Sequence, residues 1–289
     1  MVNTLVYKEE WVTKLQSRLK RPTNWKEVCR VDYTNSRVLN NPYMSTTPSI
    51  QNGTRETAFT FQTFALTNES ITINVYRELG VFMDRADIAQ NGLNVQMDMA
   101  NRQGQLMNEK IENAMLASHA DWTNIGDTGG GAIGLASTAF TVSAGNIDDI
   151  IRAVKREIRV ANGKSEMEEN GIFFIWRPAD FELLEAYVQA NGFQTADNAL
   201  REGTKEGFFY LGAYHYYSND HTSGHIFAGV KKLYHLGICR STWGQVSFIE
   251  NPAGSSGGVL SGTGVHIRAD FNFKAWNVTT PLYYDINVN

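Results

Sequence analysis

The sequence predicts an α+β fold, and three patterns along the chain support this class. Small and apolar residues recur at steps of four and three over 93–120, which indicates a helix of roughly eight turns. A shorter helical pattern covers 147–161. Apolar and polar residues alternate over 265–275, as in a strand with one buried face. No internal repeat interrupts this arrangement.

The composition fits a protein that assembles with copies of itself. The chain has 289 residues, of which 42% are hydrophobic and only 19% are charged. Interface cores are depleted in charge, so a low charged fraction suits a surface that faces other subunits. The length is sufficient for one large domain or two smaller ones.

Charge is divided unevenly along the chain. Residues 1–55 contain nine Lys and Arg residues against four Asp and Glu residues, a net charge of +5, which leaves −9 for the remainder. A basic arm on an acidic body can contact an acidic neighbour or nucleic acid, but an ordinary solvated helix explains the same charge.

The first 55 residues are predicted to form an extended arm. Residues 4–20 can form a short helix with Trp11, Leu15 and Leu19 on one side, and such a helix needs a surface on which to dock. Residues 21–55 lack periodicity and contain several prolines. A stretch of this length suits an arm that lies across a neighbouring subunit better than a loop inside a compact domain.

Cysteine use and hydropathy indicate a cytosolic protein. Cys29 and Cys239 have no partner at a metal-binding spacing, which predicts two free thiols in a reducing compartment. Charged residues at 8–10 interrupt any apolar core of a signal peptide. No segment approaches the roughly 18 apolar residues of a membrane span, so we expect no membrane contact.

A long β-hairpin is predicted after the arm. Residues 57–66 and 70–83 have strand patterns, and Thr67-Asn68-Glu69 is expected to form the turn between them. An isolated two-stranded hairpin is barely stable, so this hairpin must lie against another surface. The helix over 93–120 follows it.

A compact body is predicted from residue 126 onward. It begins with a glycine-rich loop over 126–134 and continues with the 147–161 helix, capped by Asn146 and ended near Gly163. A buried strand over 172–176 leads through Pro178 into a third helix. Aromatic strands over 207–217 and 225–238 precede the alternating strand of 265–275.

Three sequence patterns resemble nucleotide-binding, catalytic or metal-binding motifs, but each is better explained without such a site. Residues 129–134 match GxGxxG and residues 254–258 match GxSxG, but neither lies between a strand and a helix, as a dinucleotide site or a nucleophile elbow requires. His215, His221 and His225 with Asp220 have no metal-site spacing, so we expect solvated loop histidines. The sequence predicts no catalytic, cofactor or metal site.

The order of these elements resembles the major capsid protein family of tailed bacteriophages, whose fold is shared with encapsulins. Three stretches are similar to that family: 83–90, the polar segment between hairpin and long helix; 172–178, a strand-to-helix entry; and 207–219, with its glycines and final Ser-Asn. The basic arm with Trp11, Leu15 and Leu19 resembles the family's N-terminal arm.

The resemblance implies a domain plan and a function. Residues 1–55 would be the N-arm, 56–88 the extended loop, 89–125 with 245–289 the peripheral domain with its spine helix, and 126–244 the axial domain. The implied function is a non-enzymatic shell subunit that forms hexamers and pentamers around double-stranded DNA. Such a subunit assembles in the bacterial cytoplasm and stays in the virion capsid.

The implied partners are other copies of the chain, a portal protein, scaffolding or decoration proteins, and packaged DNA through non-specific contacts. Trp11, Leu15, Leu19, Arg77 and Arg85 would make contacts between subunits. An encapsulin-type compartment remains the alternative, since it shares the fold and a similar subunit size. A nucleotide-dependent enzyme that uses residues 129–134 is the alternative from another class.

Subunits of the assembled shell are predicted to remain free of covalent cross-links. Some relatives join a lysine of the extended loop to a neighbour's asparagine, which needs a deprotonated amine. No lysine lies between Lys26 and Lys110, and arginine stays protonated. Boiled, reduced particles should therefore give one band at 32.3 kDa on a denaturing gel. A ladder of multiples would contradict this.

Overall fold

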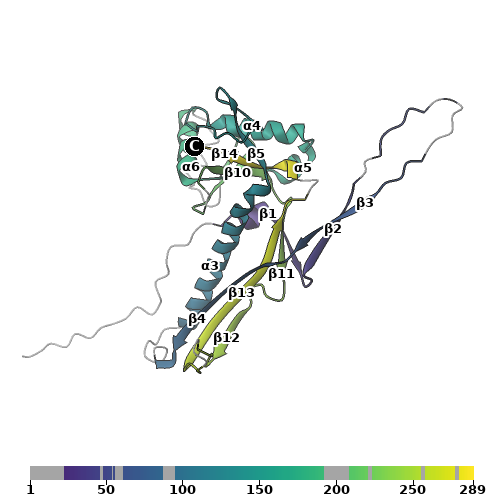
Figure 1. Cartoon of the computed structure of the whole chain (residues 1–289). Helices are drawn as coiled ribbons and strands as arrows, with labels where there is room; N and C mark the ends of the chain where they lie inside the picture. Colours follow the sequence, from purple (N-terminus) through teal and green to yellow (C-terminus); the bar gives the residue numbers. More distant parts are fainter. Residues whose placement is uncertain are drawn as a thin grey trace, which may run out of the picture.

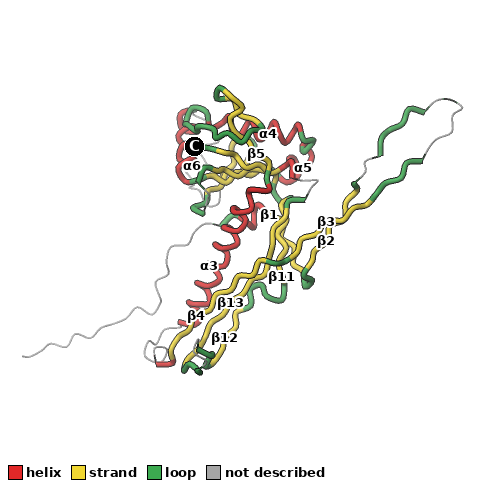
Figure 2. Tube along the Cα trace, in the orientation of Figure 1, coloured by secondary structure: helices red, strands yellow, loops and turns green. Residues whose placement is uncertain are grey.

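The computed structural model describes residues 23–45, 48–53, 55, 61–86, 95–191, 208–220, 223–254, 258–276 and 280–289. A compact body lies at one end of a long sheet and a long helix, and a two-stranded ribbon projects from the side (Figures 1 and 2). Both helices and sheets contribute to one chain, so the predicted α+β class is confirmed.

The long sheet is built around β13 (Gly262–Lys274). One edge of β13 pairs antiparallel with the whole of β4 (Val75–Asp84). Its other edge pairs with β12 (Val246–Glu250) near one end and β11 (Tyr234–Cys239) near the other. Strand β1 (Cys29–Thr34) extends the sheet by pairing in parallel with β11. The predicted alternation of 265–275 is confirmed, since Val265, Ile267, Ala269 and Phe271 are buried.

The compact body contains a seven-stranded sheet. Its strands are β5 (Thr123–Gly129), β6 (Ala132–Gly134), β7 (Ile172–Trp176), β8 (Phe208–Tyr210), β9 (Ala213–Tyr217), β10 (His225–Val230) and β14 (Tyr283–Asn287). They lie in the order β6-β5-β14-β10-β7-β9-β8. All residues of β7 are buried, as expected for a central strand.

Each face of this sheet belongs to a different core. Side chains alternate along β7, so Phe174 and Trp176 pack in the core formed with α4 (Ile147–Val160) and α6 (Pro178–Ala190). Phe173 and Ile175 face the other way. The short helix α5 (Lys164–Asn170) packs near α4 and β10, and η2 (Thr280–Leu282) packs near α4 and β5.

The second core joins the body to the rest of the molecule. Helix α3 (Val95–Ala117), predicted over 93–120, contributes Met107, Ile111 and Met115 to it, together with side chains of the long sheet. Nearer the N-terminus of α3, Gln103 Nε2 donates a 2.8 Å hydrogen bond to the carbonyl oxygen of Val265 in β13. The helix is therefore fixed to both sheets.

The predicted pairing of 57–66 with 70–83 in a hairpin is wrong. Strand β3 (Leu66–Thr72) pairs antiparallel with β2 (Val38–Met44), and these two strands form the ribbon. Thr67-Asn68-Glu69, expected as a turn, lies inside β3 opposite Tyr43, Pro42 and Asn41. The predicted strand bounds also differ from the structure, since residues 61–65 form no strand and 70–83 is divided between β3 and β4. Alternation carries no information on which strand each one pairs with.

Further differences concern glycines and loops. The glycine-rich 126–134 segment is a hairpin of β5 and β6, whose turn uses positive φ angles at Gly129, Gly130 and Gly131. The predicted 207–217 strand breaks at Leu211 and Gly212, both with positive φ. The predicted 225–238 strand divides between the two sheets, as β10 and β11. Each break comes from a tight turn that apolar patterning does not encode.

The two sheets also cut across the predicted domain boundaries. Strand β1 from the predicted arm and β11 from the predicted axial segment both belong to the long sheet. Strand β14, predicted with 245–289, pairs with β10 and β5 in the body. The chain passes between the two sheets several times, because strands distant in sequence complete each sheet.

A buried carboxylate ties the start of the described chain to α3. Glu112 Oε2 accepts hydrogen bonds from the backbone N–H groups of Asn24 (3.0 Å) and Trp25 (2.9 Å), which begins α1 (Trp25–Val28). Asn24 Nδ2 donates to Glu112 Oε1 at 3.3 Å. Desolvation outweighs these hydrogen bonds and raises the pKa of Glu112 to about 7.

Glu112 should make the stability of the subunit depend on pH. Its pKa is higher in the folded state, so its stabilising contribution is complete below about pH 4.5 and is lost as pH rises through about 7. Between pH 5 and 8 the free energy of unfolding should fall by about 2–3 kcal/mol more for wild type than for Glu112→Gln. Denaturant unfolding measures both profiles; parallel profiles would contradict the prediction.

Candidate assembly surfaces

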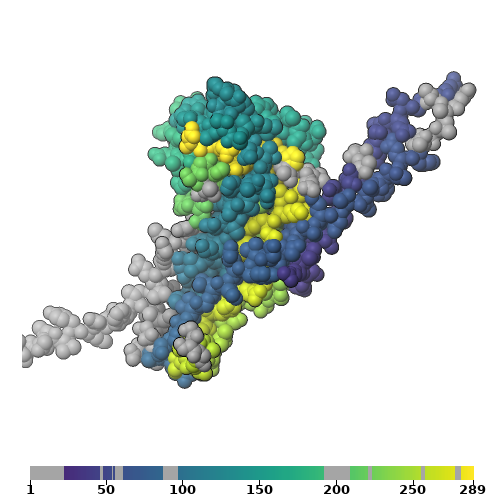
Figure 3. Space-filling view, viewed as in Figure 1, coloured from purple at the N-terminus to yellow at the C-terminus, as the bar shows by residue number. Residues whose placement is uncertain are grey.

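The ribbon of β2, β3 and the connecting segment exposes large apolar side chains. It projects away from the body (Figure 3), and among the residues of β2 and β3 only Glu69 and Ile71 are buried. Apolar side chains gathered on a projecting element are typical of a protein interface. The following are between 51% and 99% exposed: Met44, Ile50, Phe61, Phe64 and Leu66.

The base of the ribbon is held firmly by the long sheet. Ile71 and Ile73 are buried beside Gly237 of β11, where an added Cβ would lie 3.6 Å from Ile71 and 3.9 Å from Ile73. Asn272 Nδ2 donates a 2.8 Å hydrogen bond to the carbonyl oxygen of Thr72. The base of the ribbon therefore packs on the long sheet, whereas Met44, Ile50, Phe64 and Leu66 stay exposed.

A second apolar surface lies at the far end of the long sheet, where β12 and β13 meet. Phe248 and Ile249 are adjacent in β12, so they point to opposite faces, and both are about half exposed. Val259 and Leu260, in the connection to β13, are 76% and 39% exposed. Among the described strands, β12 pairs only with β13, so its other edge is open to a further strand.

A groove of about 460 Å³ separates β4 from α3. Leu79 and Leu106 give it an apolar lining, and Arg77 and Lys110 add positive charge. Glu78 also lines the groove. A partner segment that carries apolar side chains and a carboxylate would complement this surface.

The predicted contact residues are distributed over separate places. Arg77 is exposed on β4 opposite Ala269, so it belongs to the long sheet and not to a projecting hairpin. Arg85 is exposed just beyond the other end of β4, where its backbone N–H bonds the carbonyl of Ser261 at 3.2 Å. Trp11, Leu15 and Leu19 lie outside the described residues.

The two sequence motifs have strands on both sides. The GxGxxG segment forms the turn and second strand of the β5–β6 hairpin, so no helix N-terminus follows to meet a pyrophosphate. The GxSxG segment connects β12 to β13, and its residues 255–257 lie outside the described ones. Neither segment therefore has the strand-to-helix context that a dinucleotide site or a nucleophile elbow requires.

The expectation of solvated histidines was wrong for His215, which is completely buried. Its Nδ1 accepts a 3.0 Å hydrogen bond from Trp176 Nε1, and its Nε2 lies 3.1 Å from the carbonyl oxygen of Tyr210. Desolvation lowers the pKa of His215 to about 4, so the ring is a neutral part of the core. His221 lies outside the described residues.

Sequence reasoning missed the residues that His225 does meet. His225 lies beside His119 and Asp285, and these three residues form a His119–His225–Asp285 cluster. They come from parts of the chain more than fifty residues apart, so no sequence spacing could indicate the cluster.

Within the described chain, none of the helices combines the length and apolar character that crossing a membrane requires.

Comparisons with known proteins identify the fold. No protein-family model and no curated protein matches this sequence. Solved structures do match: Mycobacterium phage Che8, at 14% identity and TM-score 0.66, covers 97% of both chains. The capsid of Ralstonia phage GP4, at 9% identity and TM-score 0.69, covers 98% of this chain and 95% of that one.

A virus-like particle from Pyrococcus furiosus also matches, at 8% identity and TM-score 0.55, over 92% of this chain and 93% of that one. These similarities extend over almost the whole chain at very low sequence identity, so they concern the arrangement of elements. The expected fold is confirmed: this chain has the fold of the phage capsid structures that it matches.

Proposed function

We propose that this chain is the major capsid protein of a tailed bacteriophage. The observation that carries the proposal is the ribbon, which exposes Ile50 and Leu66 on an element that projects from the body. An element of this kind gains stability only against another molecule. The capsid fold makes a second copy of the chain the natural partner.

In this proposal the ribbon of one subunit lies on the long sheet of its neighbour. The groove beside Arg77 and the open edge of β12 supply apolar and charged contacts for it. Arg85 would add a charged contact at the end of β4. Trp11, Leu15 and Leu19 would dock the N-terminal arm on a further copy.

The assembled form would consist of hexamers and pentamers in a closed icosahedral shell around double-stranded DNA. The basic character of residues 1–55 supports non-specific contact with packaged DNA. A portal protein and scaffolding or decoration proteins would complete the head. Assembly would take place in the bacterial cytoplasm, and the mature protein would remain in the virion capsid.

An encapsulin-type compartment is the second candidate. The virus-like particle from Pyrococcus furiosus supports a related shell architecture, but its TM-score of 0.55 is lower than the 0.66 and 0.69 of the phage structures. The greater structural similarity to the phage structures supports a phage head over a compartment. The two functions differ in what the shell encloses.

Size and content of purified particles test the proposal. A shell subunit should elute from gel filtration in the megadalton range, whereas an unassembled chain has a mass of 32.3 kDa. Electron microscopy should reveal icosahedral particles, and nuclease-resistant DNA inside them identifies a phage head. Particles filled with protein cargo would identify the compartment instead, and a small enzyme-sized species would exclude both.

The exposed apolar side chains of the ribbon should drive assembly. Burying an Ile or Leu contributes about 1.5–3 kcal/mol, so Ile50→Gln with Leu66→Gln should raise the subunit concentration needed for assembly at least about tenfold. The melting temperature of the unassembled subunit should change little, because both side chains are exposed there.

Val160→Gln is the matched control, since Val160 is 71% exposed on α4 in the compact body. Light scattering at increasing subunit concentration compares the variants with wild type. Assembly of the double variant at the wild-type concentration would show that the ribbon is not an assembly surface.

A further inference from the structure

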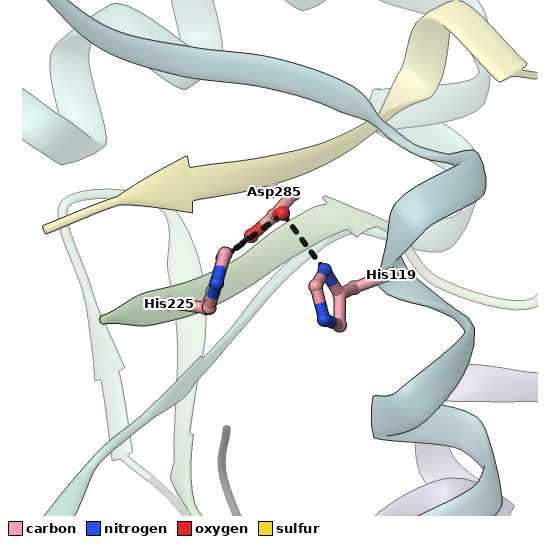
Figure 4. A group of neighbouring side chains, drawn as sticks. All are labelled: His119, His225 and Asp285. Carbon is pink, nitrogen blue, oxygen red and sulfur yellow. Dashed lines mark hydrogen bonds and ion pairs between the residues drawn. The ribbon is translucent and has the colours of Figure 1, made fainter. Parts of the chain in front are cut away.

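Three side chains with metal-binding groups converge where α3 meets the compact body (Figure 4). His119 belongs to η1 (Ser118–Asp121), directly after α3, while His225 and Asp285 belong to β10 and β14. His225 Nδ1 lies 2.8 Å from Asp285 Oδ1, and His119 Nδ1 lies 3.0 Å from Asp285 Oδ2. The three ligand atoms all lie within 4.8 Å of one another.

The strand register explains why two of the three meet. Asp285 lies opposite Phe227, and His225 is two residues before Phe227. The side chains of Asp285, Phe227 and His225 therefore point to the same face of the sheet. The His119 ring lies over this face, with its centroid 5.6 Å from that of Phe227 and 4.4 Å from that of His225. The end of α3 thus brings a second imidazole to the carboxylate.

We propose that His119, His225 and Asp285 bind a divalent transition metal ion with the preferences of zinc. Two imidazole nitrogens and one carboxylate are a donor set that zinc accepts, with bonds of about 2.0–2.2 Å. In a tetrahedral site such bonds place the ligand atoms about 3.3 Å apart. The 2.8 and 3.0 Å separations from Asp285 are a few tenths of an ångström shorter than this, and the ligand atoms of the two histidines lie within 4.8 Å of each other, so the two rings would adjust to share one ion.

Burial and access both suit a metal ion. The Asp285 side chain is only 4% exposed, so its charge has lost most of its hydration and benefits from a cation beside it. The His119 and His225 side chains are 20% and 23% exposed, which leaves room for water as the fourth ligand. The site does not depend on the proposed function of the chain.

A bound ion would join three elements through coordinate bonds. It would hold η1, and through it α3, against β10 and β14 of the seven-stranded sheet. Metal binding that requires the folded arrangement raises stability in proportion to ligand concentration.

Zinc titration of the full-length, chelator-treated chain tests the site. The Cys239→Ser background removes the partly exposed thiol that would otherwise also bind zinc. Isothermal titration calorimetry should detect one ion per chain, and zinc at about 100 times its Kd should raise Tm by about 5 °C. Co²⁺ should give the visible absorption of a four-coordinate site.

His119→Gln and, separately, His225→Gln should each weaken zinc binding at least tenfold. His266→Gln is the matched control, because His266 lies on β13 beside Glu78 and outside the cluster. It should bind zinc as the background protein does. The melting temperature of each variant without metal shows whether it folds.

The proposal is overturned if the folded background protein binds no zinc. It is also overturned if both cluster variants fold and bind zinc as strongly as the background protein does. In either case the three residues form a hydrogen-bonded cluster only. The measurements on the background protein remain decisive even if one cluster variant fails to fold.

Discussion

The architecture depends on the shared core between the body and the long sheet. Strand β7 sends Phe173 and Ile175 into this core, where they meet Ile111 and Met115 of α3. Side chains of the long sheet, among them Phe271, complete it. Because one core contains parts of both sheets and the helix, the body and the long sheet cannot separate without exposing large apolar side chains to water.

This constraint allows the ribbon to project without collapsing. Ile71 and Ile73 anchor its base against Gly237 of the long sheet, and the exposed apolar side chains Met44 and Leu66 can meet another molecule. In the proposed shell both properties would matter, since a rigid base sets the direction in which the contact is made. The exposed apolar side chains would then contribute their burial energy only on assembly.

The sequence alone determined the elements whose signal is local. Regular spacing of apolar residues predicted α3, α4, β7 and β13 close to their observed bounds, because a buried face imposes the period of the element on the side chains. The order of these elements was sufficient to indicate the resemblance to the capsid fold. The chain has no lysine between Lys26 and Lys110, so the ribbon contains none, just as the predicted hairpin would contain none.

Only the tertiary structure decided which distant segments meet. Strand periodicity could not assign β3 to β2 or β4 to β13, since pairing depends on contacts between strands and not on either strand alone. Glu112 meets Asn24 across 88 positions of sequence, and His119 meets Asp285 across 166. Polar groups carry no periodic signal, so such sites appear only once packing has brought their residues together.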